Sequence, residues 1–187
     1  MIKAIIFDCF GVLYPQASGD FFKRHKNLFK NSPAALDKLN SQIDLGEITR
    51  AEFFNGLQKI TGMDAHKIQA EFDEQLFVDA KLVKLIQKLK PAYKIALLSN
   101  AGKEEIEVIY RDKIEGLFDA ITVSYEVKSV KPGPEIFLIC TKLLNVKPEE
   151  CLCVDDSQKN IEAAKKLGMK TIPYPNFGKI PAGLLLL

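Results

Sequence analysis

Short, nearly continuous apolar segments recur along this chain and predict buried β-strands. They cover residues 2–7, 94–98, 120–123, 151–154 and 170–172. Segments that do not alternate with polar residues are typical of a parallel sheet covered on both faces. Amphipathic helical patterns lie between them, over residues 81–90, 134–144 and 157–167. The alternation of strands and helices predicts an α/β fold with a doubly wound, mostly parallel sheet.

One long region, residues 15–78, breaks this alternation, because it contains helical patterns and no convincing strand. Four residues that favour helix N-caps precede those patterns: Ser18, Ser32, Thr49 and Asp64. We therefore expect an α/β core formed by residues 1–14 and 79–187, with residues 15–78 inserted as a helical cap.

Composition places the chain among ordinary globular proteins, with 47% hydrophobic and 27% charged residues in a length of 187. Lys and Arg number 26, and Asp and Glu number 24, so the net charge is +2. Such a balance gives no overall field that favours nucleic acid or a membrane surface. No stretch approaches the roughly 20 apolar residues of a membrane-spanning helix. We expect no nucleic-acid and no membrane partner.

The cysteines and the two termini bear on location. Cys9, Cys140, Cys151 and Cys153 show no metal-site spacing with the histidines and are expected to be small buried hydrophobes. The apolar run before Asp8 is about four residues long, whereas a signal peptide needs roughly 7–15. A cytoplasmic location follows as the expectation. Residues 182–187 end in four leucines, which we expect to pack on the core or to mark a truncation.

Polar residues gather where the predicted strands end. They are Asp8 after the first strand, Ser99 and Asn100 after the second, Lys131 in a loop after the third, and Asp155 and Asp156 after the fourth. Because the carboxyl ends of parallel strands meet at one edge of a sheet, we expect these residues to converge there. Any one alone has an ordinary explanation, such as Asp156 capping the helix that begins near Ser157. Their joint placement favours a functional site.

Four motifs, in this order, carry a resemblance to a known family. They are FDCFGVL around Asp8, LLSN around Ser99, SVKPGPEIF around Lys131 and CVDDSQKNIEAAKKLG around Asp155 and Asp156. Together they resemble the haloacid dehalogenase superfamily, most of whose members are magnesium-dependent phosphatases. The resemblance covers residues 1–14 and about 79–175, and it implies a Rossmann-like core. The predicted cap matches that family by position only.

The resemblance implies a role for each matching residue. Asp8 would attack phosphorus and form an aspartyl-phosphate. Ser99, with the backbone at Asn100, would hydrogen-bond the phosphoryl oxygens, and Lys131 would neutralise charge. The expected substrate is a small phosphorylated metabolite.

A magnesium ion is the implied cofactor. Asp156 would bind it directly, Asp155 directly or through water, and Asp8 and the main-chain carbonyl of Phe10 would complete its protein ligands. The chemistry of the residues agrees, because carboxylates are the hard oxygen donors that Mg²⁺ takes and two anions cannot meet without cations.

Phe10 departs from the pattern of that family, whose phosphatases carry an aspartate there to protonate the leaving group. A phenyl ring cannot transfer a proton, and general acid–base catalysis contributes typically ~10²–10⁴-fold. Three functions remain open. The first is a phosphatase or phosphotransferase that works without that aspartate. The second is a 2-haloacid dehalogenase, because those enzymes carry an aromatic residue at this position. Against it, those enzymes lack the paired carboxylates that this chain has. The third is a non-catalytic protein that binds a phosphorylated ligand or a partner.

His25 is a candidate for the missing proton donor. The segment over residues 21–30 places its aromatic residues and His25 on one helical face and its lysines on the other. Such a basic face is usually solvated, which argues against nucleic acid. We hypothesise that His25, on the apolar face of the cap, substitutes in part for the aspartate that Phe10 replaces.

Overall fold

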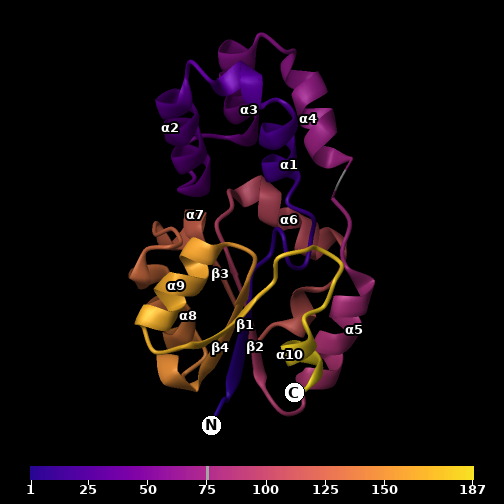
Figure 1. Ribbon diagram of the computed structural model, residues 1–187, viewed down its shortest axis with the longest axis vertical. Coiled ribbons are helices and arrows are strands. Elements are labelled where there is room, and N and C mark those ends of the chain that lie inside the picture. The colour runs from indigo at the N-terminus through magenta and orange to yellow at the C-terminus, as the bar shows by residue number, and fades with distance from the viewer. Residues whose placement is uncertain (75) are drawn as a thin grey trace.

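A single parallel β-sheet forms the centre of the molecule. The computed structural model describes residues 1–74 and 76–187, and in them the sheet has five strands in the order β3-β2-β1-β4-β5 (Figure 1). The strands are β1 (Ala4–Phe7), β2 (Lys94–Ser99), β3 (Ala120–Val123), β4 (Cys151–Asp155) and β5 (Lys170–Pro173). In the register of the central strands, Ile5 pairs with Ile95 on one side and Leu152 on the other. The predicted α/β fold is confirmed.

Helices cover both faces of this sheet. They are α5 (Ala80–Leu89), α6 (Lys103–Arg111), α7 (Ser124–Val127), α8 (Pro134–Leu143), α9 (Gln158–Lys166) and α10 (Ala182–Leu185), with 3₁₀ turns at Glu115–Leu117 and Pro148–Glu150. In Figure 1, α8 and α9 lie on one side of the strands, and α5 and α10 lie on the other. The sheet is therefore the middle of three layers, which explains why the central strands β1 and β4 are buried along their whole length.

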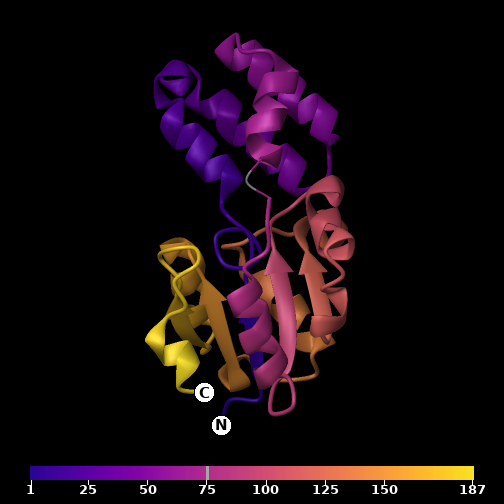
Figure 2. The same ribbon diagram turned by 90° about the vertical axis from the view of Figure 1, so that its right-hand side faces the viewer.

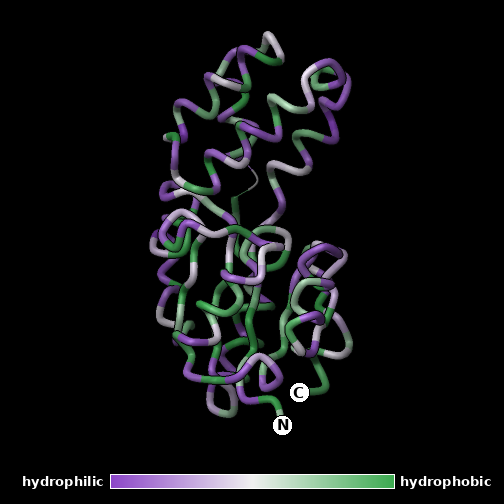
Figure 3. The backbone as a smooth tube through the Cα atoms, turned by 90° about the vertical axis from the view of Figure 1, so that its left-hand side faces the viewer, coloured by the Kyte–Doolittle hydropathy of each residue, from purple (hydrophilic) through white to green (hydrophobic). Residues whose placement is uncertain are grey.

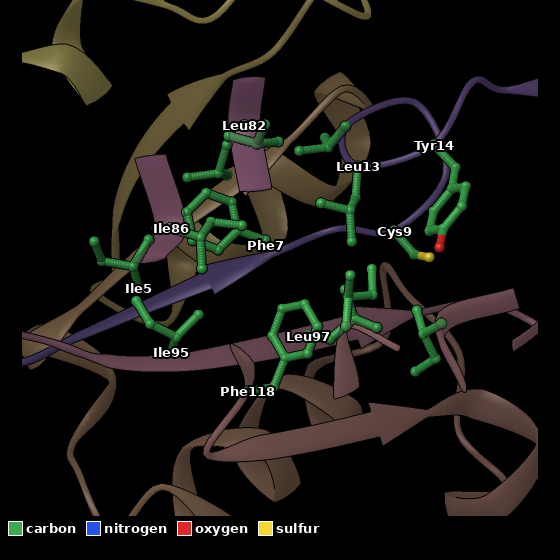
Figure 4. Close-up of a cluster of buried hydrophobic side chains, with 14 of the residues drawn as sticks. Ile5, Phe7, Cys9, Leu13, Tyr14, Leu82, Ile86, Ile95, Leu97 and Phe118 are labelled. Carbon is green, nitrogen blue, oxygen red and sulfur yellow. The ribbon is translucent and has the colours of Figure 1, made fainter. Parts of the chain in front are cut away.

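Side chains of β1 alternate between the two faces, and each set packs in its own hydrophobic cluster. Ile5 and Phe7 contact the apolar face of α5, including Leu82 and Ile86 (Figure 4). Ile6 points the other way and packs in the cluster that contains Phe137 of α8. In Figure 3, hydrophobic segments of the backbone gather at the centre of the α/β core, and hydrophilic segments lie mostly outside them.

The inserted helices form a second body beyond the carboxyl ends of the strands (Figure 2). They are α1 (Ala17–Arg24), a 3₁₀ turn (Lys26–Phe29), α2 (Pro33–Asp44), α3 (Arg50–Thr61) and α4 (Ala65–Asp73). Their shared core is rich in aromatic residues: Phe21, Phe29, Phe53, Phe54 and Phe72. We call this body the cap. Its exact boundaries at residues 15 and 78 stay a prediction.

The predicted N-caps of the cap helices have different outcomes. Thr49 forms a capping box with Glu52, and the Asp64 side chain accepts hydrogen bonds from two backbone N–H groups of α4. Ser32 stands at the N-cap of α2 without a side-chain hydrogen bond. The prediction for Ser18 was wrong, because α1 begins at Ala17 and places Ser18 inside the first turn. There the Ser18 hydroxyl bonds another side chain rather than the backbone.

Several smaller expectations are also resolved. The four cysteines are free and buried, as predicted. At the C-terminus, Leu184 of α10 is buried in the cluster that contains Ile5, so this segment packs on the core. Within the described residues, no helix is both long enough and apolar enough to cross a membrane.

Candidate active site

Three carboxylates meet at the edge of the sheet that faces the cap. Asp8 directly follows β1, while Asp155 ends the neighbouring β4 and Asp156 follows it. Each of the three offers an oxygen, and these oxygens lie within 4.8 Å of one another. The pairing of β1 with β4, in which Phe7 lies beside Val154, brings them together. The convergence expected from the sequence is therefore present.

Lys131 joins two of these carboxylates. Its Nζ lies 2.7 Å from Oδ1 of Asp8 and 2.8 Å from Oδ2 of Asp155, and all three side chains are buried. The side chain of Asn100 fixes the main chain at this point, since its Nδ2 donates to the carbonyl of Lys131 at 2.9 Å and its Oδ1 accepts from the N–H of Lys131 at 2.8 Å. The end of β2 thus positions the lysine that reaches the end of β1.

Asp155 is held by three different donors. Besides Lys131, its carboxylate accepts from the backbone N–H of Ser157 at 2.9 Å and from Nδ2 of Asn160 at 2.9 and 3.1 Å. The N-cap position of α9 belongs to Ser157, so Asp156 is not the cap of that helix. Asp156 is therefore left to face the other carboxylates.

The cluster carries an excess of negative charge. Burial raises the pKa of Asp156 to about 6, and Asp155 adds to that shift. Burial also raises the pKa of Asp8, against the opposing charge of Lys131. Although burial lowers the pKa of Lys131, Asp8 and Asp155 together raise it above its ordinary value. One lysine cannot balance three carboxylates. The missing charge and the all-oxygen donor set both fit a hard divalent cation such as Mg²⁺.

Gly11 allows the turn after β1 to lie close to Asp156 in the loop after β4. Its φ of +97° lies in the region that favours glycine, and a Cβ built on it would collide with the carboxylate of Asp156. The turn after β1 consequently runs directly against the loop after β4.

A cavity of about 420 Å³ opens between this edge and the cap. Core residues that line it include Asp8, Phe10, Asn100, Lys131, Asp156 and Asn160. Phe10 is partly buried, with its ring centroid 6.1 Å from that of Tyr14. Ser99 is fully buried at the end of β2, behind the lining, so its predicted contact with phosphate stays a prediction. Cys9 is also fully buried and packs in the core cluster that contains Ile5.

The cavity also has lining residues that the sequence patterns did not single out. Asp44 at the end of α2, Arg50 at the start of α3 and Glu105 in the first turn of α6 bring charge to it. Apolar lining comes from the cap and the segment after it, through Phe22, Ile43, Phe53, Phe72 and Leu76. Glu104 and Glu105 together could have marked the start of α6, because acidic residues favour a helix N-terminus. No comparable signal marks Asp44.

The hypothesis that His25 supplies the missing proton finds no support in the geometry. Nε2 of His25 lies 3.1 Å from Oε2 of Glu71, and its ring packs 4.6 Å from that of Phe21. Both contacts lie within the cap, and the cavity is lined by other residues. The predicted helix over residues 21–30 was wrong, because α1 ends at Arg24 with His25 as its C-cap and a 3₁₀ turn follows.

The known proteins that resemble this chain include hydrolases and phosphatases. The family model of the haloacid dehalogenase-like hydrolases matches residues 2–168. The chain is 28% identical over 198 residues to a D-ribitol-5-phosphate phosphatase of Bacteroides thetaiotaomicron, covering 94% of this chain and 93% of that protein. It is 36% identical over 99 residues to a bifunctional riboflavin kinase/FMN phosphatase of Arabidopsis thaliana, of which the match spans only 26%.

A solved structure resembles the whole chain. It is a HAD family enzyme of Bacteroides thetaiotaomicron in complex with magnesium and inorganic phosphate, with a TM-score of 0.76 and 30% identity. The likeness covers 98% of this chain and 99% of that one. Because the family model matches most of the length of this chain, the chain belongs to the haloacid dehalogenase-like hydrolases.

Proposed function

We propose that this protein is a magnesium-dependent phosphatase that acts on a small phosphorylated polyol or sugar. The observation that carries the proposal is the cluster of Asp8, Asp155 and Asp156, with Lys131 bonded to two of its members at the base of a cavity. A phosphate ester brings more negative charge to this place. It can bind there only with cations, which a divalent ion and the lysine supply.

Asp8 is the proposed nucleophile. Its Oδ1 accepts hydrogen bonds from the N–H of Cys9 at 2.6 Å and from Lys131. These two donors hold the carboxylate in one orientation at the floor of the cavity, as in-line attack on phosphorus requires. The phosphorus–oxygen bond to the alcohol breaks as the bond to Asp8 forms, and water later releases phosphate from the aspartyl-phosphate. Lys131 offsets the charge that develops on the phosphoryl oxygens.

Magnesium would be held mainly by Asp8 and Asp156, with the main-chain carbonyl of Phe10. Both oxygens of Asp155 already accept hydrogen bonds from protein donors, so Asp155 would reach the ion through water. When bound, the ion supplies positive charge to the phosphoryl group and favours the ionised form of Asp8.

The size and lining of the cavity support a small metabolite. A volume of about 420 Å³ lies in the lower part of the range for small-molecule sites. Its polar lining includes Gln16, Asn40 and Asp44, which suit hydroxyl groups. The relative that matches most of the chain and acts on a phosphorylated polyol supports the same substrate class.

A screen of phosphate esters and 2-haloacids, each with and without Mg²⁺, tests the proposal. We expect phosphate release that requires the metal. Halide release without metal would favour a 2-haloacid dehalogenase instead. If neither product forms although a phosphorylated compound binds, the protein is a binding protein on this fold, and the proposed activity is wrong.

A further inference from the structure

Two carboxyl side chains of the cavity have no part in the metal cluster. They are Asp44, the last residue of α2, and Glu105, in the first turn of α6. One comes from the cap and the other from the core. Phe10, which lines the same cavity, removes the usual proton donor. The acids that remain there are therefore candidates for its role.

Direct contacts with the core fix the position of Asp44. Its carbonyl accepts a hydrogen bond from the hydroxyl of Ser124, and that hydroxyl accepts from the N–H of Ala101 at 3.0 Å. One residue on, Nζ of Lys128 donates to the carbonyl of Leu45 at 2.7 Å. The end of α2 is thus anchored against Ser124 of α7 and the loop that follows β2, and Figure 1 shows α2 directly above α7.

Gly46 makes this close approach possible. Its φ is +65°, and a Cβ on it would lie only 3.0 Å from Cβ of Tyr125 in α7. The chain therefore leaves α2 in close contact with the core at the residue that lines the cavity, Asp44.

The surroundings of Asp44 favour its protonated form near neutral pH. Burial raises its pKa to about 7, Glu105 adds to the shift, and Lys131 opposes it. Asp44 also ends a helix, where the macrodipole disfavours an anion. Burial also raises the pKa of Glu105 itself, while Arg50 lowers it. Arg50 pairs with Asp73, Nζ of Lys128 donates to the carbonyl of Leu45, and the exposed Lys159 also lines the cavity.

We propose that Asp44 is the catalytic residue that donates a proton to the leaving-group oxygen, in place of the aspartate that Phe10 replaces. This inference rests on the proposed phosphatase function. As the phosphorus–oxygen bond of the ester breaks, the carboxyl proton of Asp44 passes to the departing oxygen, which leaves as an alcohol. The carboxylate then takes a proton from the water that attacks the aspartyl-phosphate, and phosphate leaves. Glu105 is a positioning residue that keeps Asp44 protonated.

The test compares Asp44→Asn with Asp37→Asn, an exposed acid on the same helix that serves as the matched control. Each variant is assayed with Mg²⁺ on nitrophenyl phosphate, whose leaving group needs no proton, and on a panel of polyol phosphates, whose leaving groups do. Asp44→Asn should lower kcat for the polyol phosphates by ~10²–10⁴-fold and change nitrophenyl phosphate by only a few-fold. Asp37→Asn should match the native protein on both.

The pH profile gives a second readout that a structural role would not move. Because an acid acts only while protonated, native kcat on polyol phosphates should fall as the pH rises above about 7. This fall in kcat at high pH should be absent in Asp44→Asn and should begin at lower pH in Glu105→Gln. Thermal melting and circular dichroism confirm that each variant is folded.

Each contrary outcome has a distinct meaning. An equal loss on both substrate types, a change in KM alone, or a fall in kcat at high pH that persists in Asp44→Asn would overturn the role of Asp44. Native turnover of nitrophenyl phosphate without turnover of any polyol phosphate would do the same, and would leave the proposed function standing. No metal-dependent release from any ester would overturn both.

Discussion

The edge of the sheet and the inner surface of the cap form the two sides of one cavity, and they are built in opposite ways. At the sheet edge, Asp8 and Lys131 are buried and bonded to each other. On the cap side, Asp44 is only partly buried and lines the cavity. The first arrangement is fixed by hydrogen bonds from several strands, whereas the second depends on one docked helix end.

This difference separates two kinds of chemistry. In the proposed mechanism, the sheet edge supplies what every phosphate ester needs, namely a nucleophile, a cation and counter-charge to the phosphoryl oxygens. In the same proposal, the cap supplies what depends on the alcohol, namely its proton and the shape of its pocket. Phe10 lines the same cavity, and we propose that proton donation falls to Asp44 of the cap because a phenyl ring cannot transfer a proton.

The largest effect should come from restoring an acid to the sheet edge. In an Asp44→Asn background, Phe10→Asp should raise turnover of polyol phosphates by up to ~10²–10⁴-fold, because it returns a proton donor to the same cavity. In the native background the gain should be smaller, since Asp44 already donates. A series of aryl and alkyl phosphates, assayed with all four proteins, measures the difference. Equal gains in the two backgrounds would show that the positions act independently.

Removing the lysine of the sheet edge should affect every substrate alike. Lys131→Gln should lower kcat by ~10²–10³-fold on both nitrophenyl and polyol phosphates, because the charge it offsets lies on the phosphoryl group and not on the alcohol. Lys142→Gln, at an exposed position on α8, is the control. A loss confined to polyol phosphates would place Lys131 with the leaving group.

Asn160 offers a smaller test of the metal site. Its amide holds the carboxylate of Asp155, so Asn160→Ala should weaken magnesium binding by ~10–100-fold while leaving kcat at saturating metal nearly unchanged. Titration of activity with Mg²⁺ measures the shift, and Gln158→Ala on the exposed side of α9 is the control. An unchanged magnesium requirement would remove Asp155 from the metal site.

The sheet edge could be predicted almost completely from the sequence, and the cap surface could not. Asp8 and Asp156 each follow an apolar strand, and parallel pairing leaves such residues little choice but to converge. Asp44 is the last residue of an amphipathic helix, a position that many exposed acidic residues also occupy. Its role depends on where α2 docks, which no local periodicity encodes.

His25 illustrates the same limit from the other direction. The pattern predicted a helix over residues 21–30 with His25 on its apolar face, but α1 ends at Arg24, His25 is its C-cap, and its ring packs on Phe21 inside the cap. Helical spacing tells which residues share a face. It does not tell whether that face meets a hydrophobic core or a cavity.

The smallest effect should be on stability. The pKa of Asp44 is raised in the folded protein from 3.8 to about 7. A group of this kind binds its proton more tightly in the folded state, so stability is lost as the pH rises from about 4 to about 7. Asp44→Asn should therefore gain on the order of 4 kcal/mol relative to the native protein between pH 4 and pH 8. Urea denaturation without metal at several pH values measures this, and a constant difference between the proteins would contradict it.

The most direct test of the whole account is phosphate release from nitrophenyl phosphate by the native protein and by Asp8→Asn, with and without Mg²⁺. Nitrophenyl phosphate needs no proton donor, so the measurement depends on Asp8 and the metal and not on the cap. We expect metal-dependent turnover by the native protein and none above background by the folded variant. Turnover by Asp8→Asn at the native rate, or equal rates with and without metal, would contradict attack by Asp8 at a magnesium site.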